Sequence, residues 1–265
     1  MTLSPAQIQA LRELRAVWPD TRIVIIGATA LAFHHRRPWW RTTADLDLAL
    51  ALELDDVPGP LDRAPGWRQH ARRAHEFTSP LGATIDLLPA GPTALARGQI
   101  CWPDGNVMSL IGMELAFAHA TLHTVTAGFV VQVAPSSVVC VLKMAAYCDR
   151  PTERERDLED IAHLLDAYVD DDDDRRFDEG AGRDFDLVPA YLLGRDVGAV
   201  ATSGAHRRLI ARFLDLVGDP DAVGHSLMQR AGPDRRRTDD TFLRRCLDAF
   251  QAGLAATGAA TGTST

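Results

Sequence analysis

Hydrophobic and polar positions change their period several times in the first 50 residues, which predicts strands and helices in alternation. The β-branched run at residues 21–26 ends at Gly27 and indicates a buried strand. Residues 28–35 are good helix formers and stop shortly before Pro38, so a helix is expected directly after the strand. Residues 44–50 alternate with period two, which is typical of a strand. This stretch therefore predicts the order strand, glycine turn, helix, strand.

The same patterns continue along the chain. Residues 72–78 and 83–88 flank a Ser79-Pro80-Leu81-Gly82 turn and predict a β-hairpin. Further strands are expected at 107–111, 117–126 and 129–133, the second with a helical alternative at 113–118. Besides an amphipathic first helix at 1–18, helices are expected at 136–147, with Ser136 or Ser137 as N-cap, and at 153–168, 205–217, 222–230 and 239–256.

These elements predict an α/β fold in two parts. Residues 1–135 are expected to form a mixed β-sheet with flanking helices. Residues 136–256 are expected to form a helical C-terminal domain that contains an acidic loop at 170–186. The alanine-, glycine- and threonine-rich end, 257–265, is expected to be a flexible tail.

The net charge of −8 is concentrated in one segment. Residues 153–186 carry 15 acids and 5 bases, whereas the rest of the chain carries 21 acids and 23 bases. The run of aspartates at 170–174 is expected to be a solvated loop rather than a metal site. Nucleic acid therefore remains a candidate partner despite the acidic total.

Composition excludes several classes of protein. No run of 18 apolar residues exists, so we expect no membrane span and a cytoplasmic location. The four cysteines are scattered and lack Cys-x-x-Cys spacing, so neither a zinc site nor a disulfide framework is indicated.

Lys143 is the single lysine among 28 basic residues. Because a compact ammonium and a guanidinium are not equivalent near phosphate, Lys143 is a candidate functional residue, with a surface lysine as the alternative.

Three aspartates form a candidate metal site. The period of a strand points Asp45 and Asp47 to one face, with Cα atoms roughly 7 Å apart. Two like charges on one face are unfavourable unless they are solvated or share a cation, and Mg²⁺ with phosphate oxygens is a common solution. Asp86 is a third acid, alone in an apolar run. Gly27 adds a strand-glycine-helix turn, in which the amide groups of the helix start can bind phosphate.

Two segments resemble a known family. Residues 26–31 (IGATAL) and 41–48 (RTTADLDL) are similar to the signature of the polymerase-β-like nucleotidyltransferase superfamily, in particular the AbiE-type abortive-infection toxins. Lys143 within VLKMAA and residues 156–161 (RDLEDI) match later elements of that family in order and approximate spacing. The resemblance covers residues 22–165. This chain departs from the pattern at Ala28 and in a longer segment that contains Pro38-Trp39-Trp40.

The resemblance implies a nucleotidyltransferase palm domain at residues 1–135. A nucleoside triphosphate would bind at Gly27, Ala28 and Thr29, with Arg41 at the phosphate rim. Mg²⁺ or Mn²⁺ would be held by Asp45, Asp47 and Asp86, and Asp86 would help to deprotonate the acceptor hydroxyl. Lys143 would neutralise phosphate charge, and Asp160 or Asp157 would orient it. His34 and His35 are interpreted as a basic rim rather than as metal ligands.

Several acceptors and partners stay open. The toxin resemblance points to RNA, such as a transfer-RNA end, and to a cognate antitoxin protein. Candidate phosphate contacts are Arg207, Arg208, Arg212 and the arginines at 235–237, although solvated helix faces explain them equally well. A small hydroxylated acceptor of the aminoglycoside kind is an alternative, as is a non-catalytic nucleotide- or partner-binding module with the same fold.

Overall fold

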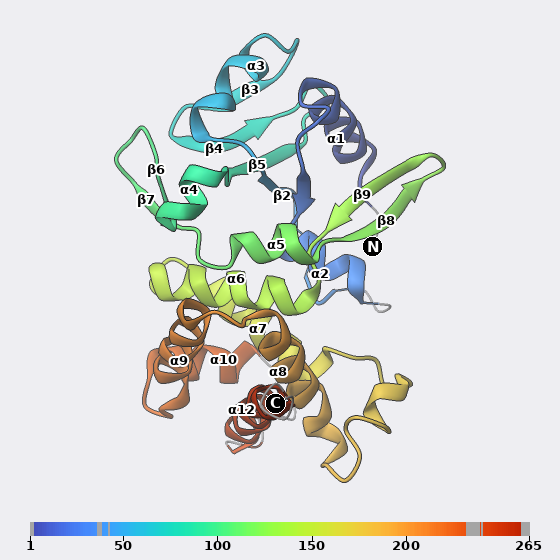
Figure 1. Cartoon of the computed structure of the whole chain (residues 1–265), viewed down its shortest axis with the longest axis vertical. Coiled ribbons are helices and arrows are strands. Elements are labelled where there is room, and N and C mark those ends of the chain that lie inside the picture. Colours follow the sequence, from blue (N-terminus) through green and yellow to red (C-terminus); the bar gives the residue numbers. More distant parts are fainter. Residues whose placement is uncertain (1–2, 36–38, 42, 232–238, 240, 261–265) are drawn as a thin grey trace. The chain divides into compact units, whose positions relative to one another are not determined.

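The computed structural model of this protein describes residues 3–35, 39–41, 43–231, 239 and 241–260. Contacts within the chain divide it into two compact units, Met1–Pro135 and Ser136–Thr265. Within the described residues every strand belongs to the first unit, and the second consists of helices and turns (Figure 1). The expected α/β class is confirmed, with a mixed sheet followed by a helical C-terminal portion.

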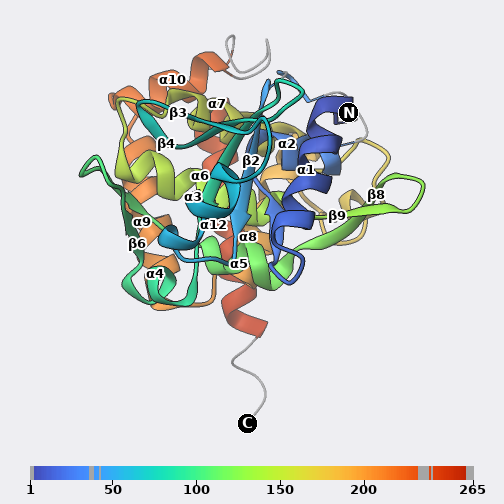
Figure 2. The same cartoon turned by 90° about the horizontal axis from the view of Figure 1, so that it is seen from above.

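A seven-stranded mixed sheet organises the first unit, in the order β3-β4-β5-β2-β1-β9-β8. Its strands are β1 (Ile23–Ile25), β2 (Asp45–Leu50), β3 (Arg68–His70), β4 (Arg73–Thr78), β5 (Thr84–Pro89), β8 (Thr121–Thr126) and β9 (Phe129–Val133). β2 pairs in parallel with β5 and antiparallel with β1, while β1 pairs in parallel with β9. The β8–β9 hairpin projects from the body of the sheet in Figures 1 and 2.

Period-two alternation separates an apolar and a polar face on β2 and β5. Leu46, Leu48 and Ile85 are fully buried on one face, and the aspartates of the same strands lie on the other. In register, Asp47 is paired with Asp86 and Asp45 with Thr84. The predicted sharing of one face by Asp45 and Asp47 therefore extends to Asp86 on the neighbouring strand.

Helices and a small second sheet complete the first unit. They are α1 (Pro5–Val17), α2 (Gly27–His34), the 3₁₀ helix η1 (Leu54–Asp56), α3 (Pro58–Asp62), α4 (Pro92–Arg97), α5 (Met113–His119) and the pair β6 (Gln99–Cys101) and β7 (Val107–Ser109). α1 begins with a capping box in which Ser4 and Gln7 exchange side-chain and backbone hydrogen bonds. The Gln7 side chain also donates to the Ala44 carbonyl, which fastens α1 beside the start of β2.

The sequence left three details of the first unit open or incomplete. Residues 107–109 pair with β6 in a separate hairpin, because the turn between Trp102 and Asn106 closes a local pair. The helical alternative at 113–118 is confirmed by α5, whose apolar residues Met113, Ala116 and Phe117 are spaced as on one face of a helix. β3 was not expected because all three of its residues are polar and exposed.

The second unit contains six helices among the described residues. They are α6 (Ser136–Asp149), α7 (Glu155–Ala167), α8 (Val188–Val200), α9 (Gly204–Gly218), α10 (Val223–Ala231) and α12 (Phe242–Ala260), with the 3₁₀ helices η2 (Asp174–Arg176) and η3 (Phe185–Leu187). Ser136, a predicted N-cap, lies inside α6. α12 continues to Ala260, into the segment predicted as a tail, whereas residues 261–265 lie outside the described residues.

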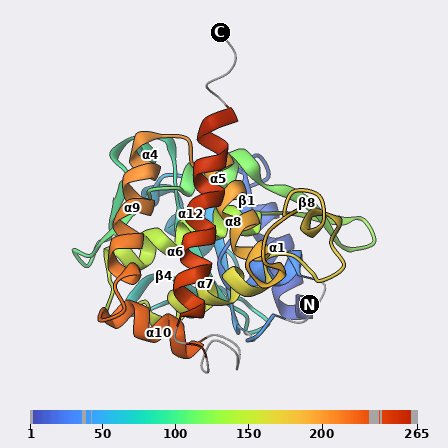
Figure 3. The same cartoon turned by 90° about the horizontal axis from the view of Figure 1, so that it is seen from below.

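Close packing between α8 and α12 depends on glycines, and Figure 3 shows the two helices lying side by side. A Cβ atom at Gly194 would lie 2.0 Å from the Phe250 carbonyl oxygen, and one at Gly253 would lie 2.1 Å from the Tyr191 carbonyl oxygen. α8 was absent from the predicted helices because Pro189 and the glycines within it weaken the helix signal. Here the glycines serve the contact between helices.

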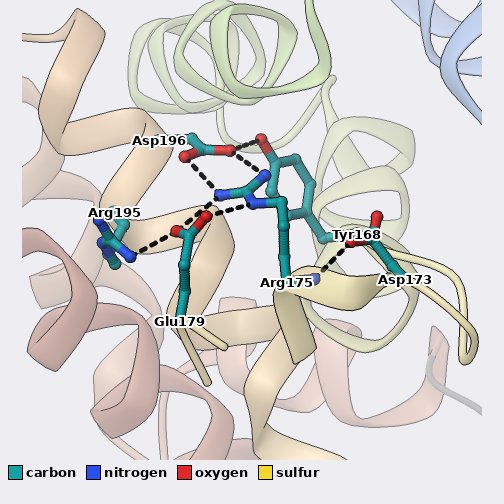
Figure 4. Close-up of polar contacts among 6 residues, drawn as sticks. All are labelled: Tyr168, Asp173, Arg175, Glu179, Arg195 and Asp196. Atoms are coloured by element: carbon teal, nitrogen blue, oxygen red, sulfur yellow. Dashed lines mark hydrogen bonds and ion pairs between the residues drawn. The ribbon is translucent and has the colours of Figure 1, made fainter. Parts of the chain in front are cut away.

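The acidic segment at 170–186 is more ordered than a solvated loop. Arg176 is buried, and its guanidinium donates to the carbonyls of Val169, Asp170 and Phe185. Arg175 makes two 2.9 Å hydrogen bonds to Asp196 of α8 and contacts Glu179 (Figure 4). The aspartates at 171, 172 and 174 are nevertheless exposed, as expected for such a charge run.

None of the helices in the described part of the chain has the length and apolar character needed to cross a membrane.

Candidate active site in the first unit

Gly27 forms the turn between β1 and α2. Its φ of +66° lies in the left-handed region, which glycine adopts without a side-chain clash. A Cβ atom built on Gly27 would lie 2.0 Å from Asp47 Oδ2. Two independent constraints, one of backbone conformation and one of space, therefore require glycine here. The Asp47 carboxylate consequently lies directly against the turn.

The start of α2 presents amide groups beside the carboxylates. Gly27, Ala28 and Thr29 form the first turn, where backbone N–H groups have no acceptor within the helix. Ile26, the N-cap residue, supplies no side-chain cap. The Thr29 hydroxyl donates to the Asp45 carbonyl at 3.3 Å, so it fastens α2 to the start of β2. An anion at this turn would meet amide groups and a positive helix end.

The three predicted carboxylates differ in exposure. Asp45 is exposed at the start of β2, whereas Asp47 and Asp86 are half-buried. Because Asp47 and Asp86 are direct partners on adjacent parallel strands, their side chains stand next to each other on one face. The structure therefore brings Asp45, Asp47 and Asp86 to one face of the sheet, next to the Gly27 turn.

Asp86 is the electrostatically strained member of this group. Burial, and then the charges of Asp47, Glu76 and Asp45, raise its pKa to about 7, against the opposing effect of Arg73. Asp86 Oδ1 is buried and has no hydrogen-bond partner among the described residues. A buried carboxylate oxygen without a partner is costly, and a cation would satisfy it.

Glu76 is a fourth acid that was not predicted. It lies directly opposite Asp86 in the β4–β5 pair and is only 8% exposed. Arg73 forms an ion pair with it at 2.5 Å. The predicted hairpin contained the necessary signal, since pairing across the Ser79–Gly82 turn places Glu76 beside Asp86. Glu76 is therefore a neighbour of the site, and Arg73 already balances its negative charge.

The donor set fits a hard divalent cation. Carboxylate oxygens are the ligands that Mg²⁺ and Mn²⁺ prefer, and Asp86 Oδ1 provides one that is free of other described partners. As the side chains stand, the described residues contain no cluster of three His, Cys, Asp or Glu groups close enough to enclose a metal ion. Asp45, Asp47 and Asp86 would hold the ion.

The remaining predicted residues near β2 have other surroundings. Arg41 is half-buried with its guanidinium 5.7 Å from the Trp40 ring centroid. His34 lies at the end of α2 opposite the Gly27 turn, bonded to the Ala134 carbonyl at 2.9 Å. Burial lowers its pKa, although the bond to that carbonyl opposes the effect. His34 is therefore not part of a basic rim at the turn. Pro38 of the longer segment lies outside the described residues.

Lys143 belongs to the second unit, where it joins α6 to α7. Its side chain is buried, and Nζ lies 2.7 Å from Asp157 Oδ1 and 2.8 Å from Asp160 Oδ2. Burial lowers the pKa of Lys143, but the charges of Asp157 and Asp160 outweigh burial and raise it above the ordinary value. Lys143 is therefore not a surface lysine, and both aspartates, not Asp160 alone, hold it.

Arg207, Arg208 and Arg212 are exposed on α9 of the second unit. The arginines at 235–237 lie outside the described residues.

Comparisons with known proteins find only distant structural similarities. No protein-family model matches the chain, and no curated protein matches it. A crystal structure of a candidate nucleotidyltransferase from H. pylori is 15% identical, with a TM-score of 0.38 over 97% of this chain and 99% of that chain. JHP933 from Helicobacter pylori is also 15% identical, with a TM-score of 0.35 over 98% of this chain and 97% of that chain. Likenesses of this size assign no function to this chain.

Proposed function

We propose that this protein is a metal-dependent nucleotidyltransferase that transfers a nucleoside monophosphate from a nucleoside triphosphate to an acceptor hydroxyl. One observation carries the proposal. Asp47 lies against the Gly27 turn at the start of α2, in register with Asp86, whose buried Oδ1 has no partner among the described residues. We infer that a helix start able to bind an anion and a pair of carboxylates able to bind a cation act together on a metal-bound triphosphate.

The residues of this site divide the work of the reaction. The amide groups of Gly27, Ala28 and Thr29 would bind the phosphates and orient the α-phosphorus. Asp45, Asp47 and Asp86 would hold Mg²⁺ or Mn²⁺, which supplies charge neutralisation when bound. The acceptor oxygen would form a bond to the α-phosphorus, pyrophosphate would leave, and Asp86 would help to remove the hydroxyl proton. Positioning and electrostatics would supply most of the acceleration.

Further roles rest on the family resemblance. Lys143, held by Asp157 and Asp160, would neutralise phosphate charge during transfer, and Arg41 would contact the phosphates. The resemblance to AbiE-type toxins also points to RNA as acceptor and to a toxin role with a cognate antitoxin.

A transfer assay tests the reaction. Purified protein is incubated with Mg²⁺, each α-³²P-labelled triphosphate in turn and total RNA, and labelled RNA is sought on a denaturing gel. Wild-type protein should label an acceptor with at least one nucleotide. Asp47→Asn should abolish labelling, whereas Asp62→Asn, which changes an exposed aspartate of α3, should not.

Two results would count against this proposal. Labelling that Asp47→Asn leaves intact would show that the carboxylates are not the site. Binding of triphosphate without any labelled RNA, or with a labelled small aminoglycoside instead, would favour one of the alternative readings of the sequence.

A further inference from the structure

The sheet edge beyond the carboxylates is strongly basic. Residues 63–75, which include β3 and the start of β4, contain four arginines, two histidines and no acid, in a chain of net charge −8. β3 is the edge strand and pairs only with β4. All four arginines are exposed, and we call the three on β3, on β4 and in the turn between them the arginine edge: Arg68, Arg72 and Arg73.

Strand register connects the arginine edge to the carboxylate site. Arg68 is paired with Thr78, Thr78 with Thr84, and Thr84 with Asp45. Directly paired residues of adjacent strands point to the same face. A row of polar residues therefore crosses four strands on the carboxylate face, from Asp45 through two threonines to Arg68. Three strand spacings make this row roughly 14 Å long between its outer Cα atoms.

The arginines of this edge differ in what they contact. Arg73 is engaged with Glu76 and lies close enough to Asp86 to lower the pKa of that acid. Within the described part of the chain, the side chains of Arg68 and Arg72 make no ion pair. The hairpin that carries them is held by its own bonds, from the Gln69 side chain to the Ala74 carbonyl and from the Arg72 amide to His70. Two cations are thus presented on an ordered hairpin without an internal counter-charge.

We propose that the arginine edge binds the phosphodiester backbone of a single-stranded nucleic acid, so that the end of that strand reaches the carboxylates. The role of the strand's terminal hydroxyl rests on the proposed function, but binding of the strand does not. Phosphates spaced along a strand match cations on the edge, and the threonine hydroxyls between offer further hydrogen bonds. A cationic small acceptor such as an aminoglycoside would instead be repelled by the charges of Arg68 and Arg72.

Fluorescence anisotropy of a labelled, unstructured 20-nucleotide RNA, measured without triphosphate at several salt concentrations, tests the proposal. The test variant is Arg68→Gln/Arg72→Gln. Each lost phosphate contact of a single strand lowers the slope of log K against log salt by about 0.7. The double variant should therefore lose about 1.4 in slope and bind about 25-fold more weakly at 0.1 M salt. The matched control, Arg230→Gln/Arg244→Gln, removes two exposed arginines of α10 and α12 and should stay within about twofold of wild type.

Other measurements keep this result separate from the proposed function. Arg68→Lys/Arg72→Lys should keep the wild-type slope, and Asp47→Asn should keep RNA binding. The melting shift with Mg²⁺ and triphosphate should be unchanged in the edge variant. If RNA binds through the arginine edge but no triphosphate shifts the melting transition, the proposed function is wrong and the inference that the arginine edge binds RNA is retained.

The opposite pattern would overturn the inference. An edge variant with wild-type affinity and slope, an equal loss in the Arg230→Gln/Arg244→Gln control, or equal competition by polyglutamate would each show that this edge is not a nucleic-acid surface.

Discussion

At the scale of single residues, Gly27 determines where the Asp47 carboxylate lies. Gly27→Ala would strain the positive φ by about 1–2 kcal/mol and place a methyl group on Asp47 Oδ2. We expect Asp47 to rotate away, so that the variant folds but loses nucleotide binding in Mg²⁺. Gly128→Ala is the matched control, because Gly128 also has a positive φ of 74° but no atom within 4 Å of a built Cβ.

Both variants are compared by calorimetric titration with Mg²⁺ and triphosphate, and by urea unfolding. If both variants lose similar stability but only Gly27→Ala loses nucleotide binding, the contact between Gly27 and Asp47 is supported. Wild-type nucleotide affinity in Gly27→Ala would contradict it.

The raised pKa of Asp86 leads to a second prediction for single residues, on the stability of the metal-free protein at different pH values. Its pKa is about 7 in the folded state against an ordinary value of 3.8, so the folded protein binds more protons between these values. The resulting stabilisation is fully present below about pH 4 and is lost as the pH rises to 7. Asp86→Asn should therefore unfold at a higher temperature than wild type at pH 8, with the difference shrinking towards pH 4.

The measurement is thermal unfolding in chelator between pH 4 and pH 8. Each 1 kcal/mol corresponds to about 2–4 °C for domains of 150–250 residues. A pH-independent difference, or a loss of stability in Asp86→Asn at pH 8, would show that Asp86 is structural rather than strained.

At the scale of elements, α6 and α7 depend on Lys143. Breaking a buried ion pair by removing one partner costs about 3–5 kcal/mol, and Lys143 is the shared cation of Asp157 and Asp160. Lys143→Met should therefore lose stability on that scale in urea unfolding, and Lys143→Met/Asp160→Asn should recover part of it. A loss below about 1 kcal/mol would mean that the pair contributes little to the packing of the two helices.

The same contact changes what Lys143→Arg can show. A guanidinium keeps the charge but must fit a site in which the lysine side chain is 7% exposed. Transfer activity is therefore interpretable only beside stability. Lost activity with stability within about 1 kcal/mol of wild type would support a role at phosphate, whereas parallel losses would show a structural one.

Strands in which apolar and polar residues alternate clearly were predictable from the sequence. Short strands that exist because of the strand they pair with were not. Period two in residues 44–50 placed Asp45 and Asp47 on one face, and the hairpin turn placed Asp86 on a strand paired with residues 73–78. β3 and β7 have three residues each, too few for a periodic signal. The glycines of α8 weaken its helix signal, although they permit contact with α12. The pairing of Asp86 with Asp47, and the place of Arg68 on the carboxylate face, follow only from strand order and register.

At the scale of the whole molecule, charge is divided unequally between the units. The first unit carries 12 acids and 11 bases, and the second carries 24 acids and 17 bases. The acidic segment of the second unit is held by the buried Arg176 through three carbonyls. Arg176→Ala should expose residues 170–186 to limited proteolysis, while Arg208→Ala, on the exposed face of α9, should not.

The measurement that tests the central claim most directly is thermal unfolding of the wild type and Asp47→Asn with Mg²⁺, with triphosphate, and with both. A ligand that binds only the folded state stabilises by about 2.7 kcal/mol at 100 times its Kd. The wild type should show a shift of several degrees only when Mg²⁺ and a triphosphate are present together, and Asp47→Asn should show none. The absence of a shift with any triphosphate at millimolar concentration, or an equal shift in both proteins, would contradict a metal-nucleotide site at Gly27, Asp45, Asp47 and Asp86.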